Sequence, residues 1–268
     1  MILSLATNAI LSLTVSLLLL QQSEWTSAGQ AEASVTEPTP TDEAPEIKSE
    51  LGPRHQLTYE EWVDILAREA QAIAATSPER LSVLAGDSIA LWFPPELLPP
   101  ETTWLNQGIS GETTDGLYKR LKLLDDTNPD AIFIIIGIND LIRGFEDNVI
   151  LDNYWQIIRD IRQHHPNTEI VVQSILPHSS ENATWEGRDR LLEIPNERIR
   201  ELNRELERLA TAEGVKYLNL FPLFTDEEGN LDLDFTTDGL HLNERGYLVW
   251  RSALQLYREI ELANAPLD

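Results

Sequence analysis

A serine, a histidine and an aspartate stand where this sequence could support nucleophilic catalysis. Ser88 follows an apolar run that ends at Gly86, and Asp238 lies three residues before His241 near the other end of the chain. A serine hydroxyl becomes a useful nucleophile only when a base takes its proton, and histidine can do so near neutral pH. The spacing of Asp238 and His241 brings both side chains to one side of a single turn, where the carboxylate could fix the imidazole tautomer. These residue types indicate acyl transfer through a serine.

Each of these residues also has a structural interpretation. Glycine, aspartate and serine are turn residues, so the segment GDS could be an ordinary turn after a strand. His241 could be a histidine at a helix entrance with no task, and Asn139 could belong to a turn that caps a short helix. Asp238 could join Asp232 and Asp234 in a calcium loop. The run LDLDFTTDG, however, lacks the regular acidic alternation and the terminal glutamate of an EF-hand.

The elements that must position these residues alternate along the chain. The predicted strands are the apolar segments 81–85, 103–107, 131–136, 169–174 and 215–220. The predicted helices are 58–75, opened by a Thr58/Glu61 capping box, and 115–124, 151–163, 194–213 and 243–262, the last capped by Asn243. This alternation predicts an α/β fold, a doubly wound three-layer α/β/α sandwich with a five-stranded parallel sheet. Ligands bind at the carboxyl ends of such strands, where the candidate residues collect.

The N-terminal part of the chain differs in composition from the rest. Residues 1–20 carry no charged side chain and are long enough to span a bilayer. They predict either a signal peptide, with a small-residue cleavage site at 31–33, or an uncleaved membrane anchor. Residues 21–52 are rich in proline, threonine and glutamate and predict a disordered acidic linker, so the folded domain spans 53–268. Either interpretation predicts an extracytoplasmic location: secreted, periplasmic or anchored to the membrane.

The overall composition limits the partners. The chain has 268 residues, a formal net charge of −25 and no cysteine. Its acidity argues against nucleic acid and anionic membrane surfaces as partners, and it favours a neutral ester over an anionic substrate such as acyl-CoA. An acetylated carbohydrate or another short acyl ester fits best. The absence of cysteine excludes disulfides, thiolate metal sites and a cysteine nucleophile, and no nucleotide-binding glycine motif is present.

Four motifs resemble those of the SGNH or GDSL hydrolases, a family of serine hydrolases. They occur in the family's order as AGDSI, NQGISG, GIND and DGLH, at 85–89, 106–111, 137–140 and 238–241. The resemblance covers roughly Leu81 to the C-terminus, and Ile89 stands where the family often has leucine. It implies a flavodoxin-like fold and a carboxylic ester hydrolase with Ser88, Asp238 and His241 as its catalytic triad. It implies no cofactor and no metal.

The resemblance also implies an oxyanion hole. The attacked carbonyl becomes an oxyanion, which needs preorganised hydrogen-bond donors. The family uses the backbone N–H groups that correspond to Ser88 and Gly108 and the side-chain amide that corresponds to Asn139. A glycine at 108 suits this role, because a backbone donor must approach the substrate closely. The implied reaction forms an acyl-enzyme on Ser88, releases the alcohol with a proton from His241, and ends with attack by water.

Two aromatic residues close to the nucleophile are candidates for substrate binding. Trp92 and Phe93 follow Ser88 closely, and two prolines stiffen the segment after them. Either ring could form a wall of the acyl pocket, or the segment could simply pack onto the core. In the long connection 177–194, Trp185 could face the substrate, although most of that segment has the composition of a surface loop.

Two further functions are compatible with the same residues. An O-acyltransferase would use the same site with a sugar hydroxyl as acceptor in place of water. A tethered binding module could keep the fold without catalysis. The complete set Ser88, Gly108, Asn139, Asp238 and His241 argues against that module, which has no need of all five. The sequence therefore favours a serine esterase.

Overall fold

The computed structural model describes residues 57–264. The segment 1–20, predicted as a signal peptide or an anchor, and the predicted linker 21–52 lie outside these residues, as does the start of the predicted domain. Among residues 57–264, no helix combines the length and the apolar character that crossing a membrane requires.

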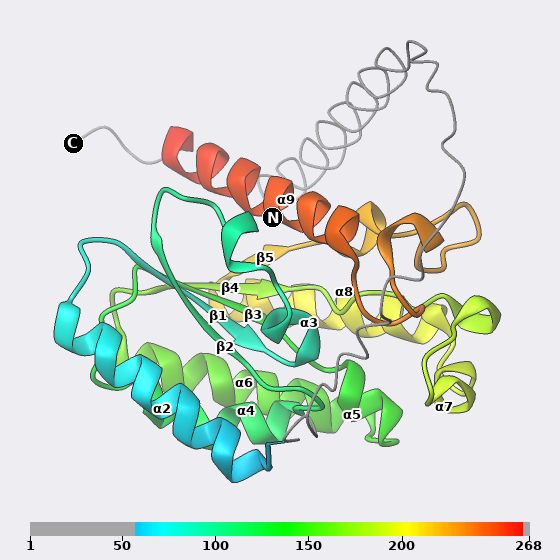
Figure 1. Ribbon diagram of the computed structural model, residues 1–268, viewed down its shortest axis with the longest axis horizontal. Helices are drawn as coiled ribbons and strands as arrows, with labels where there is room; N and C mark the ends of the chain where they lie inside the picture. Colours follow the sequence, from blue (N-terminus) through cyan, green and yellow to red (C-terminus); the bar gives the residue numbers. More distant parts are fainter. Residues whose placement is uncertain (1–56, 265–268) are drawn as a thin grey trace, which may run out of the picture.

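The centre of the domain is a parallel sheet, as predicted. Its strands are β1 (Leu81–Gly86), β2 (Thr103–Gly108), β3 (Ala131–Ile135), β4 (Glu169–Gln173) and β5 (Lys216–Leu218). They lie in the order β2-β1-β3-β4-β5, and each neighbouring pair is parallel (Figure 1). All of β1 and most of β3 are buried, because helices cover both faces of the sheet. This burial accounts for the continuous apolar runs in the sequence.

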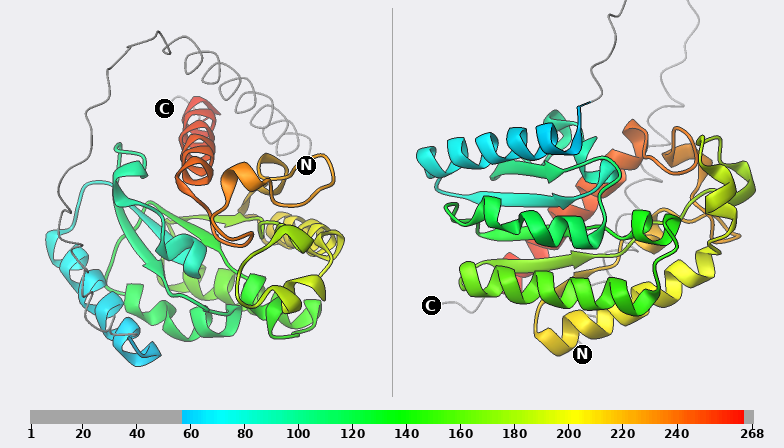
Figure 2. Two further views of the ribbon diagram at one scale, coloured as in Figure 1. Left: turned by 45° about the vertical axis from the view of Figure 1, so that its right-hand side comes forward. Right: turned by 90° about the horizontal axis from the view of Figure 1, so that it is seen from below.

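Helices form the two outer layers. On one face lie α4 (Thr114–Arg120), α6 (Asp147–His164) and α8 (Asn196–Glu213), and α9 (Glu244–Asn264) crosses the other face (Figures 1 and 2). Helix α2 (Tyr59–Thr76), the first among residues 57–264, packs against β2, where Gln107 Nε2 donates to the Leu66 carbonyl at 3.3 Å. The prediction of a three-layer α/β/α sandwich is confirmed.

Local signals in the sequence set most of the helix boundaries. The predicted capping box opens α2: Thr58 Oγ1 accepts the Glu61 N–H, and Glu61 Oε2 accepts the Thr58 N–H. Asn243 Oδ1 accepts the Gly246 N–H at 3.0 Å at the start of α9, as predicted. Helix α8 begins two residues later than predicted, because Pro195 disfavours a helical conformation at the residue before it.

Several short helices were not predicted. A short helix α7 (Arg188–Leu192) lies in the connection predicted as a loop. Four unpredicted 3₁₀ segments are η1 (Pro95–Leu97), η3 (Ser180–Asn182), η4 (Phe221–Leu223) and η5 (Leu233–Phe235). A further one, η2 (Leu121–Leu124), forms the end of the predicted helix 115–124. Two more short helices, α3 (Ser88–Leu91) and α5 (Ile138–Ile142), follow β1 and β3 directly. These two are the ones that concern function.

The carboxyl ends of the neighbouring strands β1, β2 and β3 lie side by side at one edge of the sheet. Gly86 at the end of β1 pairs with Gly108 of β2 on one side and with Ile135 of β3 on the other. The chain leaves β1 toward one neighbour, whereas β3 continues the sheet in the opposite direction, which makes this edge a switch point of the topology. Helices α3 and α5 both begin here, so the fold brings Ser88 and Asn139 to the same edge of the sheet.

Candidate active site

Ser88, His241 and Asp238 form one hydrogen-bonded chain in the structure. The Nε2 atom of His241 lies 3.2 Å from Ser88 Oγ, and its Nδ1 atom lies 2.8 Å from Asp238 Oδ2. Ser88 is only 5% exposed and His241 only 8%, so both residues are buried at this edge of the sheet. The distances are those of a nucleophile, a base within reach of its proton, and a group that orients the base.

The turn between η5 and α9 holds the carboxylate of this chain. Asp238 Oδ1 accepts the N–H groups of Leu240 at 3.0 Å and His241 at 2.8 Å, which leaves Oδ2 to face the imidazole. Burial raises the pKa of Asp238, but the hydrogen bonds from the His241 side chain and from the two backbone groups outweigh it. The pKa therefore lies below its usual value. Asp238 stays ionised at neutral pH and can stabilise a positive imidazole ring.

The calcium-loop interpretation of this segment has no support in the structure. Asp232 Oδ1 accepts the N–H of Asp234, and Asp234 pairs with Arg245 at 3.2 Å. The side chain of Asp238 is instead hydrogen-bonded to His241. Within residues 57–264, no group of three histidine, aspartate or glutamate side chains is arranged to hold a metal ion.

The connection 177–194 is hydrogen-bonded to the turn that carries Asp238. The backbone N–H groups of Thr184 and Trp185 both donate to the Asp238 carbonyl, at 2.8 and 2.9 Å. The indole of Trp185 is partly buried against the core. The structure thus gives Trp185 a contact with the turn that carries Asp238, which the sequence did not indicate.

Asn139 carries a buried side-chain N–H donor that no residue within 57–264 accepts. It is the second residue of α5, and its Nδ2 atom is buried without a hydrogen-bond partner among the described residues. An unpaired buried donor costs about 1–3 kcal/mol, so such a group in a native structure calls for an explanation. Its neighbour Asp140 is fully buried and accepts the N–H and Oγ1–H of Thr114, which anchors α5. A rigid, unsatisfied amide at the strand edge suits an oxygen ligand.

Gly108 does not present a free donor, contrary to the expectation from the resemblance. Its backbone N–H donates to Asn106 Oδ1 at 2.9 Å. A Cβ at this position would lie only 2.3 Å from the Leu91 backbone nitrogen, so the glycine permits close packing of β2 against α3. Asn106 completes the link by donating from Nδ2 to the Ala90 carbonyl at 2.7 Å. The asparagine two residues before the glycine was the signal for this hydrogen bond, and sequence reasoning missed it.

Gly111, three residues further along, differs from Gly108 in its backbone N–H. Its N–H has no hydrogen-bond partner within residues 57–264, and its φ of +76° is one that favours glycine. Arg143 donates to the Gly111 carbonyl at 2.6 Å, and the Arg143 backbone N–H donates to the Asn139 carbonyl. The loop after β2 is therefore tied to the helix that carries Asn139.

The two aromatic candidates, Trp92 and Phe93, differ in their exposure to solvent. Phe93 is 1% exposed and packs between Tyr247 and Trp250 of α9, with ring centroids 5.1 and 4.9 Å away. The prediction that it could form a substrate wall is wrong, because core packing leaves it inaccessible. Trp92 is 50% exposed, and its ring lies 4.4 Å from the His241 ring, tilted by 36°. Trp92 follows Ser88 by four residues, the spacing that places two side chains on one side of a helix.

A buried carboxylic acid lies directly before the nucleophile. Asp87 is 1% exposed and caps α3 by accepting the Ile89 N–H at 2.9 Å. Burial raises the pKa of Asp87 to about 7; the hydrogen bond from Ile89 opposes this, and the nearby Asp140 and Glu112 add to it. The Asp87 carboxyl is therefore partly protonated near neutral pH.

Replacing Asp87 with asparagine is expected to change the dependence of stability on pH. An unfolded aspartate has a pKa of about 3.9, so between about pH 4 and pH 7 the native state holds a proton that the unfolded state has released. The wild type therefore loses free energy of unfolding as pH rises through this window. Asparagine does not titrate and can still cap α3. The Asp87→Asn variant should gain stability relative to the wild type up to pH 7 and then hold it.

Urea unfolding of both proteins between pH 4.5 and 8 measures this difference. The gain can reach a few kcal/mol, because a pKa difference of one corresponds to ~1.4 kcal/mol. Asp115→Asn is the control, since Asp115 is a surface residue paired with Lys119. A stability difference between Asp87→Asn and the wild type that stays constant with pH would contradict this assignment.

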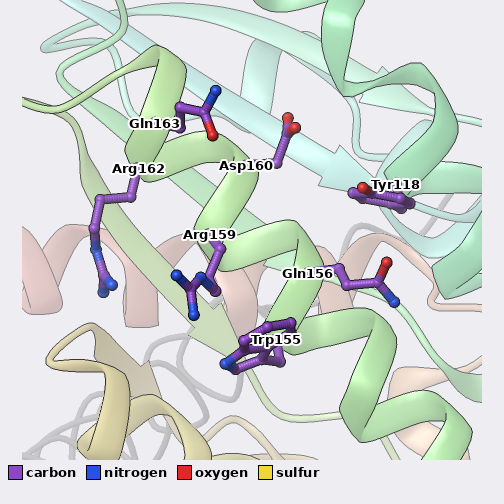
Figure 3. Close-up of a pocket in the computed structure, with 7 residues that line it drawn as sticks. All are labelled: Tyr118, Trp155, Gln156, Arg159, Asp160, Arg162 and Gln163. Atoms are coloured by element: carbon purple, nitrogen blue, oxygen red, sulfur yellow. The ribbon is translucent and has the colours of Figure 1, made fainter.

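A separate depression of about 540 Å³ lies on the outer surface of α6. It is lined by residues of α6 together with Tyr118 of α4 (Figure 3). Arg159 stacks over the Trp155 ring there, 4.6 Å from its centroid, and Trp155 is 40% exposed. None of the residues of the hydrogen-bonded chain lines this depression. It is thus distinct from the candidate active site.

Comparison with known proteins agrees with this fold. Residues 73–249 match the model of the GDSL-like lipase/acylhydrolase family. An arylesterase from Vibrio mimicus is 33% identical over 120 residues, which cover 39% of this chain and 60% of the arylesterase. This chain thus matches less than two thirds of that relative's length.

Two solved structures share the fold. One, from Streptococcus pneumonia and named for platelet activating factor, has a TM-score of 0.66 and 30% identity and covers 74% of this chain and 95% of its own. The other, an acetyl xylan esterase, has a TM-score of 0.52 and 18% identity and covers 65% of this chain and 98% of its own. The predicted hydrolase fold is confirmed. This chain belongs to the GDSL-like lipase/acylhydrolase family, a family of carboxylic ester hydrolases.

Proposed function

We propose that this protein is a serine esterase that hydrolyses neutral carboxylic esters with a short acyl group. The observation that carries the proposal is the hydrogen-bonded chain from Asp238 through His241 to Ser88. No other role accounts as well for a buried serine, a histidine within 3.2 Å of it and an ionised carboxylate on the far nitrogen of the same ring.

The geometry supports a two-step reaction. In the first step His241 Nε2 takes the proton of Ser88 as Oγ attacks the ester carbonyl carbon, and a tetrahedral intermediate forms. The bond to the alcohol oxygen then breaks, and the alcohol leaves with the proton from Nε2, so Ser88 carries the acyl group. In the second step His241 takes a proton from water, whose oxygen attacks the acyl carbon. The bond from the acyl carbon to Ser88 Oγ then breaks, His241 returns the proton to Oγ, and the acid leaves. Asp238 holds the imidazole throughout.

The oxyanion hole in this proposal has two backbone donors and one side-chain donor. Ser88 contributes its own N–H at the start of α3, and Asn139 contributes the buried Nδ2 that has no partner among the described residues. Gly111 replaces Gly108 as the third donor, because the Gly108 N–H is engaged by Asn106. Donors fixed before the reaction stabilise developing charge without reorganising, which is the largest single contribution in many enzymes.

An activity screen of the full chain tests the function and its substrate class. Phenyl esters of acetate, butyrate and octanoate test the acyl length, and acetylated xylan tests a carbohydrate ester. The net charge of −25 disfavours anionic esters, and an arylesterase is among the relatives. Released acid is expected for the short esters. Transfer of the acyl group to an added sugar with no release of acid would instead support an acyltransferase, and no turnover of any ester would contradict the proposal.

Replacing Asn139 with alanine is expected to lower kcat far more than it changes KM. The amide bonds the oxyanion of the transition state rather than the carbonyl of the substrate. Loss of one such donor typically lowers kcat by roughly 10²–10³-fold. Steady-state kinetics on phenyl acetate measure this, with Asn148→Ala on the exposed surface of α6 as the control. An Asn139→Ala protein within a few-fold of the wild type would remove Asn139 from the oxyanion hole.

A further inference from the structure

We propose that Trp92 forms the subsite for the leaving alcohol, and that this alcohol carries a ring, aromatic or sugar. The inference rests on the proposed esterase function and names the part of the substrate that Trp92 contacts. From the sequence alone, this ring could form a wall of the acyl pocket or pack onto the core. The structure supports a position on the opposite side of the reacting carbon.

The argument begins with the position of the His241 ring. Its Nε2 atom must reach two oxygens in turn: Ser88 Oγ, from which it takes a proton, and the alcohol oxygen, to which it gives that proton. General acid catalysis requires a separation of about 2.6–3.2 Å, so the alcohol oxygen must lie directly beside Nε2. The oxyanion points instead to the donors of Ser88, Asn139 and Gly111. Of the three groups on the reacting carbon, the alcohol is therefore the one beside the His241 ring.

Trp92 is the aromatic residue that packs on that ring. The two centroids are 4.4 Å apart, so a group bonded to the alcohol oxygen meets the indole next. Half of the Trp92 side chain is exposed and open to such a contact. The acyl substituent has no comparable reason to lie near the indole, since it points away from His241. Trp92 thus adjoins the alcohol.

The local structure holds Trp92 in place. Its backbone N–H donates to the Ser88 carbonyl at 3.1 Å, at the end of the single turn of α3. Asn106 Nδ2 bonds the Ala90 carbonyl, and the Tyr247 hydroxyl bonds the Ile89 carbonyl at 3.0 Å. The buried ring of Phe93 anchors the next residue in the core. An indole carried on a backbone held in this way is a preformed surface, and an aromatic ring gains about 0.5–1.5 kcal/mol from stacking on it, or roughly 2–10-fold.

A test on the full chain compares alcohols and acyl groups separately. The kcat/KM values for ethyl acetate, phenyl acetate and an acetylated xylo-oligosaccharide vary the alcohol, and phenyl acetate, butyrate and hexanoate vary the acyl chain. We use kcat/KM because it includes the step in which the alcohol leaves. Trp92→Ala should lower kcat/KM for at least one ring-bearing ester about 2–10-fold more than for ethyl acetate, with the acyl series keeping its order. Trp92→Phe should restore most of the loss.

Trp155→Ala is the matched control, since Trp155 is similarly exposed but lies on the outer surface of α6. A larger loss with phenyl acetate than with the sugar ester assigns an aromatic alcohol, and the reverse assigns a sugar. An equal loss on all esters, ethyl acetate included, would overturn the subsite and make Trp92 a residue that only positions His241. If Trp92→Ala changes the preference among acyl groups and leaves the preference among alcohols unchanged, the subsite is overturned and Trp92 contacts the acyl group. If the wild type cleaves no ester, the esterase proposal falls with the subsite; in the other cases it stands.

Discussion

Replacing Ser88 with alanine is expected to reduce ester turnover to near background while the fold survives. The hydroxyl is the group that forms the acyl-enzyme, and no neighbouring group can replace it. In a serine hydrolase of another fold, loss of the nucleophile or of the histidine costs roughly 10⁶-fold in kcat. The kcat of His241→Ala should therefore fall as far as that of Ser88→Ala. The kcat of the double variant Ser88→Ala/His241→Ala should be scarcely lower than that of either single variant. Such non-additivity distinguishes two groups of one catalytic unit from two independent contributors.

The measurement is kcat on phenyl acetate, with circular dichroism to verify the fold. Ser252→Ala is the matched control, because the Ser252 hydroxyl bonds only the Leu248 carbonyl within α9. That variant should keep full activity. Normal turnover by Ser88→Ala would eliminate the covalent mechanism, and a double variant far worse than both single variants would separate Ser88 from His241.

Replacing Asp238 with asparagine is expected to lower kcat by roughly 10⁴-fold, the loss that the equivalent change causes in a serine protease. The structure gives a specific reason. Oδ1 of Asp238 accepts two backbone N–H groups, so an asparagine must place its oxygen there and its NH₂ group toward His241 Nδ1. The imidazole then has to accept at Nδ1 and carry its proton at Nε2. That tautomer cannot take the proton of Ser88.

The readout that separates this effect from misfolding is nuclear magnetic resonance of the imidazole nitrogens. The wild type should protonate Nδ1, and Asp238→Asn should protonate Nε2. Asp234→Asn provides the control, since Asp234 lies on the surface, where it pairs with Arg245. Activity of Asp238→Asn within tenfold of the wild type, with an unchanged tautomer, would show that Asp238 does not orient the base.

The sequence was sufficient for the sheet and for the three residues of the hydrogen-bonded chain. Apolar runs bounded by turn residues mark buried parallel strands, and motifs at strand ends must meet at one edge. The Asp238–His241 spacing is local and is fixed by a short turn. Features that depend on periodicity or on a few neighbouring residues were therefore predictable.

Features decided by long-range packing were not. Trp92 and Phe93 are neighbours of similar character, and only the position of α9 determines that one is buried and the other half exposed. The unpaired amide of Asn139 is a property of its surroundings, which no motif records. The error at Gly108 has a different origin. The side chain of Asn106 accepts the Gly108 N–H, whereas the resemblance to a motif implied that this N–H is free to bind the substrate.

Ser88 follows the first strand and His241 precedes the last helix, 153 residues further along. A ribosome adds about 5–20 residues each second, so the nucleophile is synthesised on the order of ten seconds before its base. A growing chain, or one cut short anywhere before His241, carries the serine without a group to activate it. The hydrolase therefore cannot act before His241 has been synthesised, and copies that end between Ser88 and His241 cannot attack the esters around them.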